Sequence, residues 1–345
     1  MLQKKKNGLI LVTGGAGFIG SNLVAHYLSR NRPVRLFDNL SREGTEKNLE
    51  WLKSLGSANL EVVRGDVRDY SELRRAAADA DVIFHLAAQV AVTTSVVDPR
   101  TDFDVNALGT FNLIEAARAS GRLPVVIYSS TNKVYGGMET ARVEHTEDGY
   151  RYGDMPFGVS EEWPLDFHSP YGCSKGAADQ YVRDYARIYD LPTVVFRQSC
   201  IYGPRQFGNE DQGWVAHFTI SAAFGRPITI YGDGYQVRDI LHVYDLVRAF
   251  ELAVDGVDRV RGRVYNMGGG PENVISLHWL VRMLNDELGR PLQVGFGDWR
   301  PGDQRVYVSD VRKAGEDLGW VPQIDARKGV RQLLAWIQSN PTLFG

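Results

Sequence analysis

The stretch LILVTGGAGFIGSN, residues 9–22, joins an apolar run to three glycines, Gly14, Gly17 and Gly20. The run is typical of a buried strand, and a segment with helical spacing follows the glycines. Glycines between a strand and a helix allow a tight turn and a close approach of the main chain to a pyrophosphate at the helix N-terminus. The stretch therefore predicts a dinucleotide-binding turn.

Short β-branched runs alternate with helix-like segments through the first 200 residues. We expect strands at 9–13, 33–38, 60–66, 81–88, 125–130 and 192–199, and helices at 18–30, 102–120 and 171–189. Strands that alternate with helices form βαβ units, and these build a parallel sheet with helices on both faces. The sequence thus predicts an α/β protein with a doubly wound parallel sheet, the Rossmann fold.

Beyond residue 200 the expected strands are shorter and the alternation is less regular. We expect strands at 227–232, 263–268 and 292–297, and helices near 244–255, 276–288 and 326–338. We interpret residues 1–200, with a return of about 237–268, as an NAD-binding Rossmann domain and 201–345 as a smaller C-terminal α/β lobe. Because ligands of such sheets bind beyond the carboxyl ends of the strands, we expect the lobe to close over that crevice and select the substrate.

Composition excludes several classes of partner. Lys and Arg number 39 against 42 Asp and Glu, so there is no basic excess for nucleic acid or an anionic membrane. No apolar stretch approaches the roughly 18–20 residues that span a bilayer, and the basic start at 4–6 reads as a solvated leader. Two cysteines, Cys173 and Cys200, give neither a disulfide framework nor metal-ligand spacing, so we expect no metal and a cytoplasmic location.

Acidic and small residues at later strand ends extend the predicted cofactor site. Asp38 ends the second strand 18 residues past Gly20, where a carboxylate can hold the adenosine ribose hydroxyls and repel a 2′-phosphate. This favours NAD over NADP, although Arg35 and Arg42 lie close enough in sequence to keep NADP open. Asp66 follows the third strand and could meet the adenine edge, or it could belong to a plain turn. The remaining candidate cofactor residues are Phe18, Ile19, Asn39, Val67 (at the adenine edge), Leu86, Ala87, Ala88, Gln89 and Ser129.

Tyr171 and Lys175 are four residues apart at the start of a predicted helix, so both side chains lie on one face. A nearby ammonium and a positively charged nicotinamide ring both stabilise a phenolate, which makes a tyrosine usable as a base. Thr131, at the end of the fifth strand, adds a hydroxyl that can bond to a substrate alkoxide. We expect these three side chains to form an acid–base set.

These motifs resemble the extended short-chain dehydrogenase/reductase family, in particular its NAD-dependent sugar-nucleotide epimerases and dehydratases. The resemblance runs from GGAGFIG through YGCSK at 171–175 to VRDILHVYDL at 237–246 and RPGDQRVYVSD at 300–310. It implies bound NAD, with Thr131, Tyr171 and Lys175 in the catalytic positions and Lys175 also at the nicotinamide ribose. It further implies that Asn106 supports this lysine, and that the chain forms a homo-oligomer, a dimer or tetramer, through helices near 102–120 and 171–189.

The residues after Thr131 bear on the reaction. Dehydratases of this family usually carry an acidic residue there, whereas this chain has Asn132 and Lys133, so water loss lacks a proton donor and simple hydride chemistry is favoured. The closer likeness is to epimerases that act on C2 of a CDP-hexose through a 2-keto intermediate. The alternatives are CDP-glucose and CDP-mannose as substrates, a UDP-sugar 4-epimerase, a reductase that releases NADH, and a non-catalytic dinucleotide-binding regulator.

The ketone must rotate and present its other face while it stays bound, so the diphosphate of the substrate has to be held firmly. Arg238 and Arg305 have guanidinium groups that suit phosphate oxygens, although each could form an ordinary ion pair, as Arg238 could with Asp239. Cys200 stands where many sugar-nucleotide epimerases carry an asparagine. The other candidate substrate residues are Thr131, Asn132, Gln198, Gln206, Gln212, Trp214 and Asp303.

Overall fold

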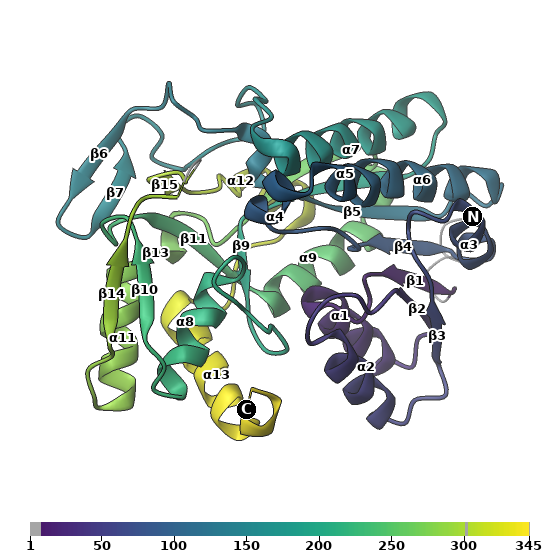
Figure 1. Cartoon of the computed structure of the whole chain (residues 1–345). Coiled ribbons are helices and arrows are strands. Elements are labelled where there is room, and N and C mark those ends of the chain that lie inside the picture. Colours follow the sequence, from purple (N-terminus) through teal and green to yellow (C-terminus); the bar gives the residue numbers. More distant parts are fainter. Residues whose placement is uncertain (1–7, 301–302, 345) are drawn as a thin grey trace.

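A seven-stranded parallel sheet forms the centre of the computed structural model, which describes residues 8–300 and 303–344; the basic leader at 4–6 lies outside them (Figure 1). In spatial order the strands are β12 (Arg263–Met267), β8 (Thr193–Gln198), β5 (Val125–Thr131), β4 (Val82–His85), β1 (Ile10–Thr13), β2 (Val34–Asp38) and β3 (Leu60–Arg64). Strand order reverses at β1, whose neighbours are β2 and β4. The predicted doubly wound fold is confirmed.

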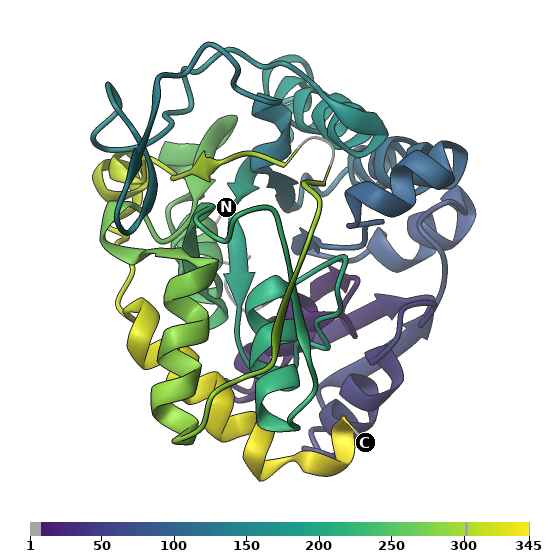
Figure 2. The same ribbon diagram turned by 60° about the vertical axis from the view of Figure 1, so that its left-hand side comes forward.

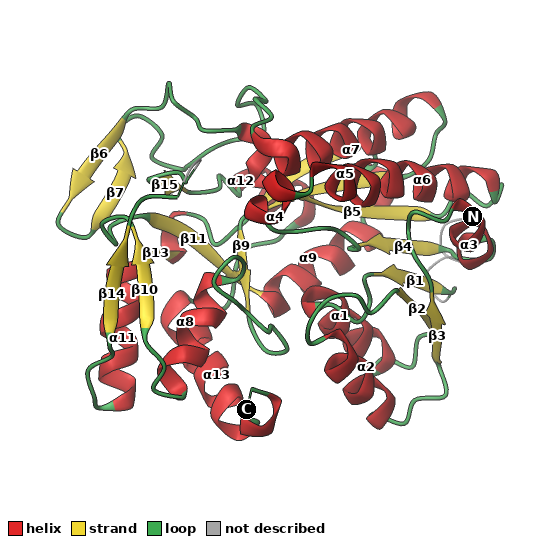
Figure 3. Cartoon of the chain, viewed as in Figure 1, coloured by secondary structure: helices red, strands yellow, loops and turns green. Residues whose placement is uncertain are grey.

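Helices cover both faces of this sheet (Figure 3). One face carries α1 (Phe18–Leu28), α2 (Thr45–Ser54), α9 (Val243–Asp255), α10 (Val257–Val260) and α12 (Arg312–Leu318). The other carries α3 (Tyr70–Ala77), α6 (Gly109–Ala119) and α7 (Ser169–Ile188), with α4 (Val92–Val97) and α5 (Pro99–Phe103) packed on α7. The chain thus returns to the sheet twice after residue 240.

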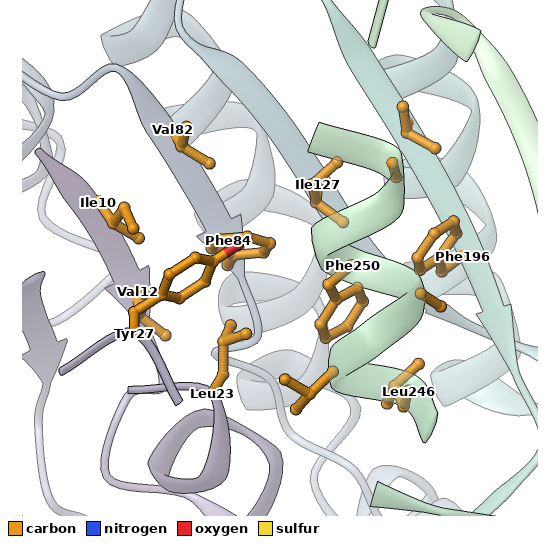
Figure 4. Packing of buried hydrophobic residues seen from close by; sticks show 14 of the residues in the cluster. Ile10, Val12, Leu23, Tyr27, Val82, Phe84, Ile127, Phe196, Leu246 and Phe250 are labelled. Carbon is orange, nitrogen blue, oxygen red and sulfur yellow. The ribbon is translucent and has the colours of Figure 1, made fainter. Parts of the chain in front are cut away.

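Alternation along the strands supplies the two cores. Ile10 and Val12 point to the face of α1 and α9, whereas Leu11, between them, belongs to the core under α6 and α7. Figure 4 shows the first core, where Phe84 and Phe196 meet Phe250 of α9. The inner strands are buried on both faces and their sequences are mostly apolar, which is why sequence alone located them. The edge strand β3 is partly exposed.

Shorter strands and three helices build a second lobe, which Figure 2 brings toward the viewer. β11 (Val237–His242) pairs with β13 (Val274–Ser276), β15 (Val306–Tyr307) and β9 (Cys200–Tyr202). β10 (Ile228–Tyr231) pairs with β14 (Val294–Gly297), and β6 (Val143–Thr146) with β7 (Gly149–Tyr152). The core of the lobe lies under α8 (Trp214–Ala223), α11 (Leu277–Leu288) and α13 (Ala326–Ser339).

The helix expected at 102–120 is divided. It consists of α5, a π-helical turn η2 (Asp104–Leu108) and α6. A π-helical turn inserts one extra residue into the helical repeat, which apolar periodicity does not reveal. Short 3₁₀ turns complete the chain: η3 (Asn132–Tyr135), η4 (Pro271–Asn273) and η5 (Pro341–Leu343).

Candidate active site

The glycine turn lies between β1 and α1, as its sequence predicts. A Cβ on Gly20 would stand 2.1 Å from the carbonyl oxygen of Gly14, and one on Gly14, whose φ is +69°, would stand 2.6 Å from the Ala87 nitrogen. Neither position has room for a side chain. Gly17 is the N-cap of α1, and no side chain caps that end, so its amides and the helix dipole suit an anion.

Asp38 ends β2 beside this turn. Its carboxylate is largely buried and accepts hydrogen bonds from the main-chain nitrogens of Ala16, at 3.0 Å, and Leu40, at 2.9 Å. Burial raises the pKa of Asp38, and the two amide bonds oppose the rise. The carboxylate therefore joins the glycine turn to the end of the neighbouring strand, at the point where the strand order reverses.

The next strand end carries a second acidic group. Asn39 donates a 2.9 Å hydrogen bond to Asp66, and Arg68 forms an ion pair with the same carboxylate at 2.8 Å. The Arg68 hydrogen bond holds the pKa of Asp66 well below its usual range. Val67 is buried in the sheet core and packs against Gly109 of α6.

Asn106, in the π-helical turn, joins the end of β4 to α7. Its side chain exchanges hydrogen bonds with the main chain of Gln89, at 2.9 and 3.0 Å, and donates to Ser174 at 3.2 Å. It thus reaches α7 through Ser174, the neighbour of Lys175. Leu86, Ala87 and Ala88 lie in the connection between β4 and Gln89.

Asp102 is a site residue that the sequence analysis missed. This fully buried carboxylate accepts hydrogen bonds from Ser174 at 2.5 Å and from Asn106 and Gln89 at 3.1 Å. Burial raises the pKa of Asp102. The hydrogen-bond partners of Asp102 are up to 72 residues away along the chain, so local sequence does not reveal them. The only signal in the sequence is an acidic residue on an expected helix.

Tyr171 lies in the first turn of α7, where Pro170 has the fixed φ suited to a helix start. The Tyr171 amide has no helical acceptor and donates instead to the Ser95 hydroxyl at 3.2 Å. Burial raises the pKa of Tyr171 to about 12, and a hydrogen bond with the Thr131 hydroxyl opposes the rise. The structure thus brings together the tyrosine and the threonine of the predicted set.

Lys175 lies one helical turn further and is almost fully buried. Its Nζ donates a 2.6 Å hydrogen bond to the main-chain oxygen of Ser129 and stands 4.4 Å from the ring centroid of Tyr128. Burial lowers the pKa of Lys175 to about 7, and the Asp179 carboxylate opposes the fall. The amine is therefore directed at β5, and the stabilisation of a Tyr171 phenolate expected from it is not visible in the pKa of that tyrosine.

Arg238 and Asp303, two of the expected substrate residues, form an ion pair of 2.5 Å between β11 and the segment before β15. The alternative pairing of Arg238 with Asp239 does not occur, because successive residues of a strand point to opposite faces. Asp239 is fully buried and accepts hydrogen bonds from Ser199 and Ser309. Gln198 lies opposite Thr131 in the register of β8 and β5.

The other candidate substrate residues are more scattered. Trp214 donates from its indole to the Cys200 sulfur at 3.5 Å, which places both at the junction of β9 and α8. Gln212 accepts a hydrogen bond from Arg42, which lies in the loop after β2. Asn132 is buried beside Thr131, and Gln206 donates to the main chain of Ile201.

Arg305 stands apart from this group. Its guanidinium lies 5.4 Å from the ring centroid of Tyr150 and 6.0 Å from that of Trp299, and the residue is exposed. Its main-chain oxygen, however, accepts a 2.9 Å hydrogen bond from the nitrogen of Val237, the residue before Arg238. Arg300, which the sequence analysis did not single out, lies 4.0 Å over the ring of Tyr231 and forms ion pairs with Glu210 and Asp211.

The fold and the glycine turn define a dinucleotide-dependent enzyme. Comparisons with known proteins identify its family. The family model for GDP-mannose 4,6 dehydratase matches residues 11–333. A curated relative, CDP-paratose 2-epimerase from Salmonella typhi, is 46% identical over 96% of this chain and 99% of its own. UDP-glucose 4-epimerase from Thermotoga maritima, solved with UDP-glucose, has a TM-score of 0.84 at 31% identity over 96% of this chain and 99% of its own.

A second solved structure, UDP-glucose 4-epimerase from Thermus thermophilus in complex with NAD, has a TM-score of 0.81 at 31% identity over 96% of this chain and 99% of its own. This chain therefore belongs to the NAD-dependent sugar-nucleotide epimerase and dehydratase family of extended short-chain dehydrogenases/reductases. It is an NAD-dependent sugar-nucleotide epimerase, as its motifs imply. None of the helices in the described part of the chain is long and apolar enough to cross a bilayer.

The residues of the crevice fit NAD. The turn at Gly14 and Gly20 is packed too tightly for a Cβ, and with the uncapped start of α1 it forms a cradle of main-chain groups that suits a diphosphate. Asp38 lies beside that cradle, and no arginine pairs with it among the described ion pairs. Arg35 is bound to Glu61 and Asp79, so it is not available for a 2′-phosphate.

Proposed function

We propose that the chain epimerises C2 of a CDP-hexose, converting CDP-paratose to CDP-tyvelose through a 2-keto intermediate. The observation that carries this proposal is the 46% identity, over nearly the whole of both chains, to CDP-paratose 2-epimerase. The site adds support, because the residues after Thr131 are an amide and an amine, Asn132 and Lys133, and neither is a carboxylic acid that could donate the proton for loss of water.

The cofactor and the protein divide the chemistry. NAD, held by Gly14, Gly17, Gly20 and Asp38, supplies a reversible acceptor for the hydride of the sugar carbon. Tyr171 takes the proton of the C2 hydroxyl and later returns it, while Thr131 hydrogen-bonds to the same oxygen. Loss of the O–H proton and the C–H hydride would leave a C2 ketone. Return of the hydride to the opposite face of C2, with return of the proton to the oxygen, would complete the inversion.

Lys175 and Asp102 position this machinery. The bond from Lys175 to Ser129 fixes α7 against the end of β5, and the Asp102–Ser174 bond fixes the same helix against the π-helical turn. We assign Arg238 to the diphosphate, which must stay bound while the flat ketone presents its other face. Burial and hydrogen bonding thus hold the reacting groups still, and only the sugar has to move.

The substrate is tested by supplying CDP-paratose, CDP-glucose and UDP-glucose separately and following the sugar protons by NMR. We expect CDP-paratose to turn over fastest, with CDP-tyvelose as the product and no release of NADH at 340 nm. Faster conversion of UDP-glucose to its C4 epimer would contradict the proposal and favour the reaction named for the solved Thermotoga maritima relative. Stoichiometric release of NADH would instead indicate net oxidation of the sugar by a dehydrogenase.

We further propose that two copies of the chain associate through α4, α5, α6 and α7. Large apolar side chains are concentrated on these helices, with Val97 85% and Phe103 55% exposed. The others are Val96, Leu108, Phe111, Tyr181, Ile188 and Tyr189. A surface of this kind on four adjacent helices is typical of an interface.

Sedimentation of a Val97→Asp, Phe103→Asp double variant tests the interface. We expect the wild-type chain to sediment as a dimer or larger and the double variant to sediment as a monomer. Phe296→Asp is the matched control, because Phe296 is 62% exposed but lies on β14 of the second lobe. An unchanged assembly in the double variant would place the interface elsewhere.

A further inference from the structure

Lys133 links the end of β5 to the segment before β15. It lies in η3, two residues past Thr131, and its main-chain nitrogen donates to the Thr131 hydroxyl at 3.2 Å. Its Nζ reaches Gln304, in the segment before β15, at 3.5 Å. Gln304 is buried and donates in turn to the carbonyl of Gly136 at 2.7 Å. The amine is therefore held between the end of β5 and the second lobe.

The charges around this amine do not balance. The cation that acts on it is Arg238, whose carboxylate partner is Asp303. Lys133 itself has a hydrogen bond to a neutral amide. Burial and then the charge of Arg238 lower the pKa of Lys133, while Asp303 opposes the fall. Two cations that share one carboxylate leave one positive charge in a partly buried place, which an anion would stabilise.

An unpartnered donor points to the same place. Gln198 is 7% exposed, and its Nε2 has no hydrogen-bond partner among the described residues. The β8 register places it opposite Thr131, and Cys200, two residues on, is close enough to feel the charges of Arg238 and Lys133. A buried donor without a partner is costly, so such a group is expected to meet an acceptor when ligand is bound.

We propose that Lys133 binds the diphosphate of the sugar nucleotide together with Arg238. The ammonium and the guanidinium then contact a dianion between them, with Asp303 orienting the guanidinium. The inference rests on the proposed function only in requiring a nucleoside diphosphate sugar as substrate. Lys133 is then a second cationic contact, beside Arg238, to the nucleoside diphosphate, which must stay fixed while the ketone rotates to present its other face.

Binding of CDP to the holoenzyme, measured by calorimetry with CDP and cytidine as probes, tests the proposal. We expect Lys133→Met to bind CDP roughly tenfold to a hundredfold more weakly, because it loses a charge-assisted contact to phosphate. Cytidine, which has no phosphate, should bind the variant and the wild type equally. Lys133→Arg, which retains the charge, should stay within a few-fold of the wild type for CDP.

Lys53→Met is the matched control, because Lys53 is exposed on α2, away from the crevice. Unchanged CDP affinity in Lys133→Met would overturn the proposal, as would an equal loss of cytidine affinity, which would indicate a damaged pocket. If the wild type prefers UDP or dTDP, the proposed CDP substrate fails. The test then uses the preferred nucleoside diphosphate, and the same loss is expected because the diphosphate is common to all three.

Discussion

Lys175 donates a 2.6 Å hydrogen bond to the main-chain oxygen of Ser129, and this bond joins α7 to the end of β5. Tyr171 precedes the lysine by one turn, and Thr131 follows the serine by two residues. Because residues four apart on a helix share a face and residues two apart on a strand share a face, the bond places the phenol beside the threonine hydroxyl. The acid–base pair is thus set by the packing of one helix on one strand.

Replacing Tyr171 by Phe should lower kcat by ~10²- to 10⁴-fold, because the proton of the sugar hydroxyl loses its acceptor. NAD content, measured by absorbance after denaturation, should stay at the wild-type level. Tyr70→Phe is the control, since Tyr70 lies on α3, outside the proposed interface, and is 38% exposed. Near-normal turnover in Tyr171→Phe would remove the phenol from its proposed role.

The buried amine of Lys175 should make stability depend on pH. Burial lowers its folded-state pKa from 10.5 to about 7, so between these values the unfolded chain holds a proton that the folded chain lacks. The free energy of unfolding should therefore rise with pH from about 7 to 10.5 and show no slope from this group below pH 7. Urea denaturation of NAD-free wild type and Lys175→Met should show a smaller rise in the variant; equal slopes would contradict the assignment.

Gly20→Ala should weaken NAD binding roughly tenfold or more, because relieving a contact of 2.1 Å must displace the Gly14 carbonyl and the turn around it. Gly56→Ala is a control that adds backbone strain without a steric contact, since Gly56 has φ +67° but no atom within 4 Å of an added Cβ. That variant should lose ~1 kcal/mol of stability and retain NAD. NAD affinity is measured by equilibrium dialysis. Equal affinity in the two variants would argue against a role of the glycine cradle in NAD binding.

Asp179, one turn after Lys175, forms a bidentate ion pair with Arg197 at 2.9 and 3.0 Å, and both side chains are almost fully buried. Arg197→Met leaves the carboxylate uncompensated and should destabilise the fold by ~3–5 kcal/mol in urea denaturation. The pair of Arg331 with Glu287 is largely exposed, so Arg331→Met should change stability by less than ~1 kcal/mol. A similar loss in the free energy of unfolding in both variants would show that burial does not determine how much an ion pair contributes to stability.

Much of the central sheet could be predicted because its strands are buried on both faces. The strand expected at 33–38 is observed at Val34–Asp38, and that expected at 192–199 at Thr193–Gln198. The middle of each run is apolar, at 36–37 and at 194–196, and this pattern is readable without knowledge of the partner strands. The helix expected at 171–189 is likewise observed as Ser169–Ile188.

The strands of the second lobe are harder to predict from sequence, because they are short and pair with residues far away along the chain. β15 has two residues, and Val306 pairs with Val237, 69 positions earlier. The same limit explains why Arg238 was considered as a partner of its neighbour Asp239, when its partner is Asp303. Alternation along β11 would have excluded the neighbour, but β11 itself was not expected as a strand.

The central claim is that one hydride leaves C2 of the sugar and returns to it without exchange with solvent. Incubating the protein with CDP-paratose in deuterated water and following the sugar protons by NMR tests this directly. We predict a C2-epimerised product that carries protium at C2. Deuterium at C2 of the product would contradict the account, because it would show that the carbon loses a proton to solvent.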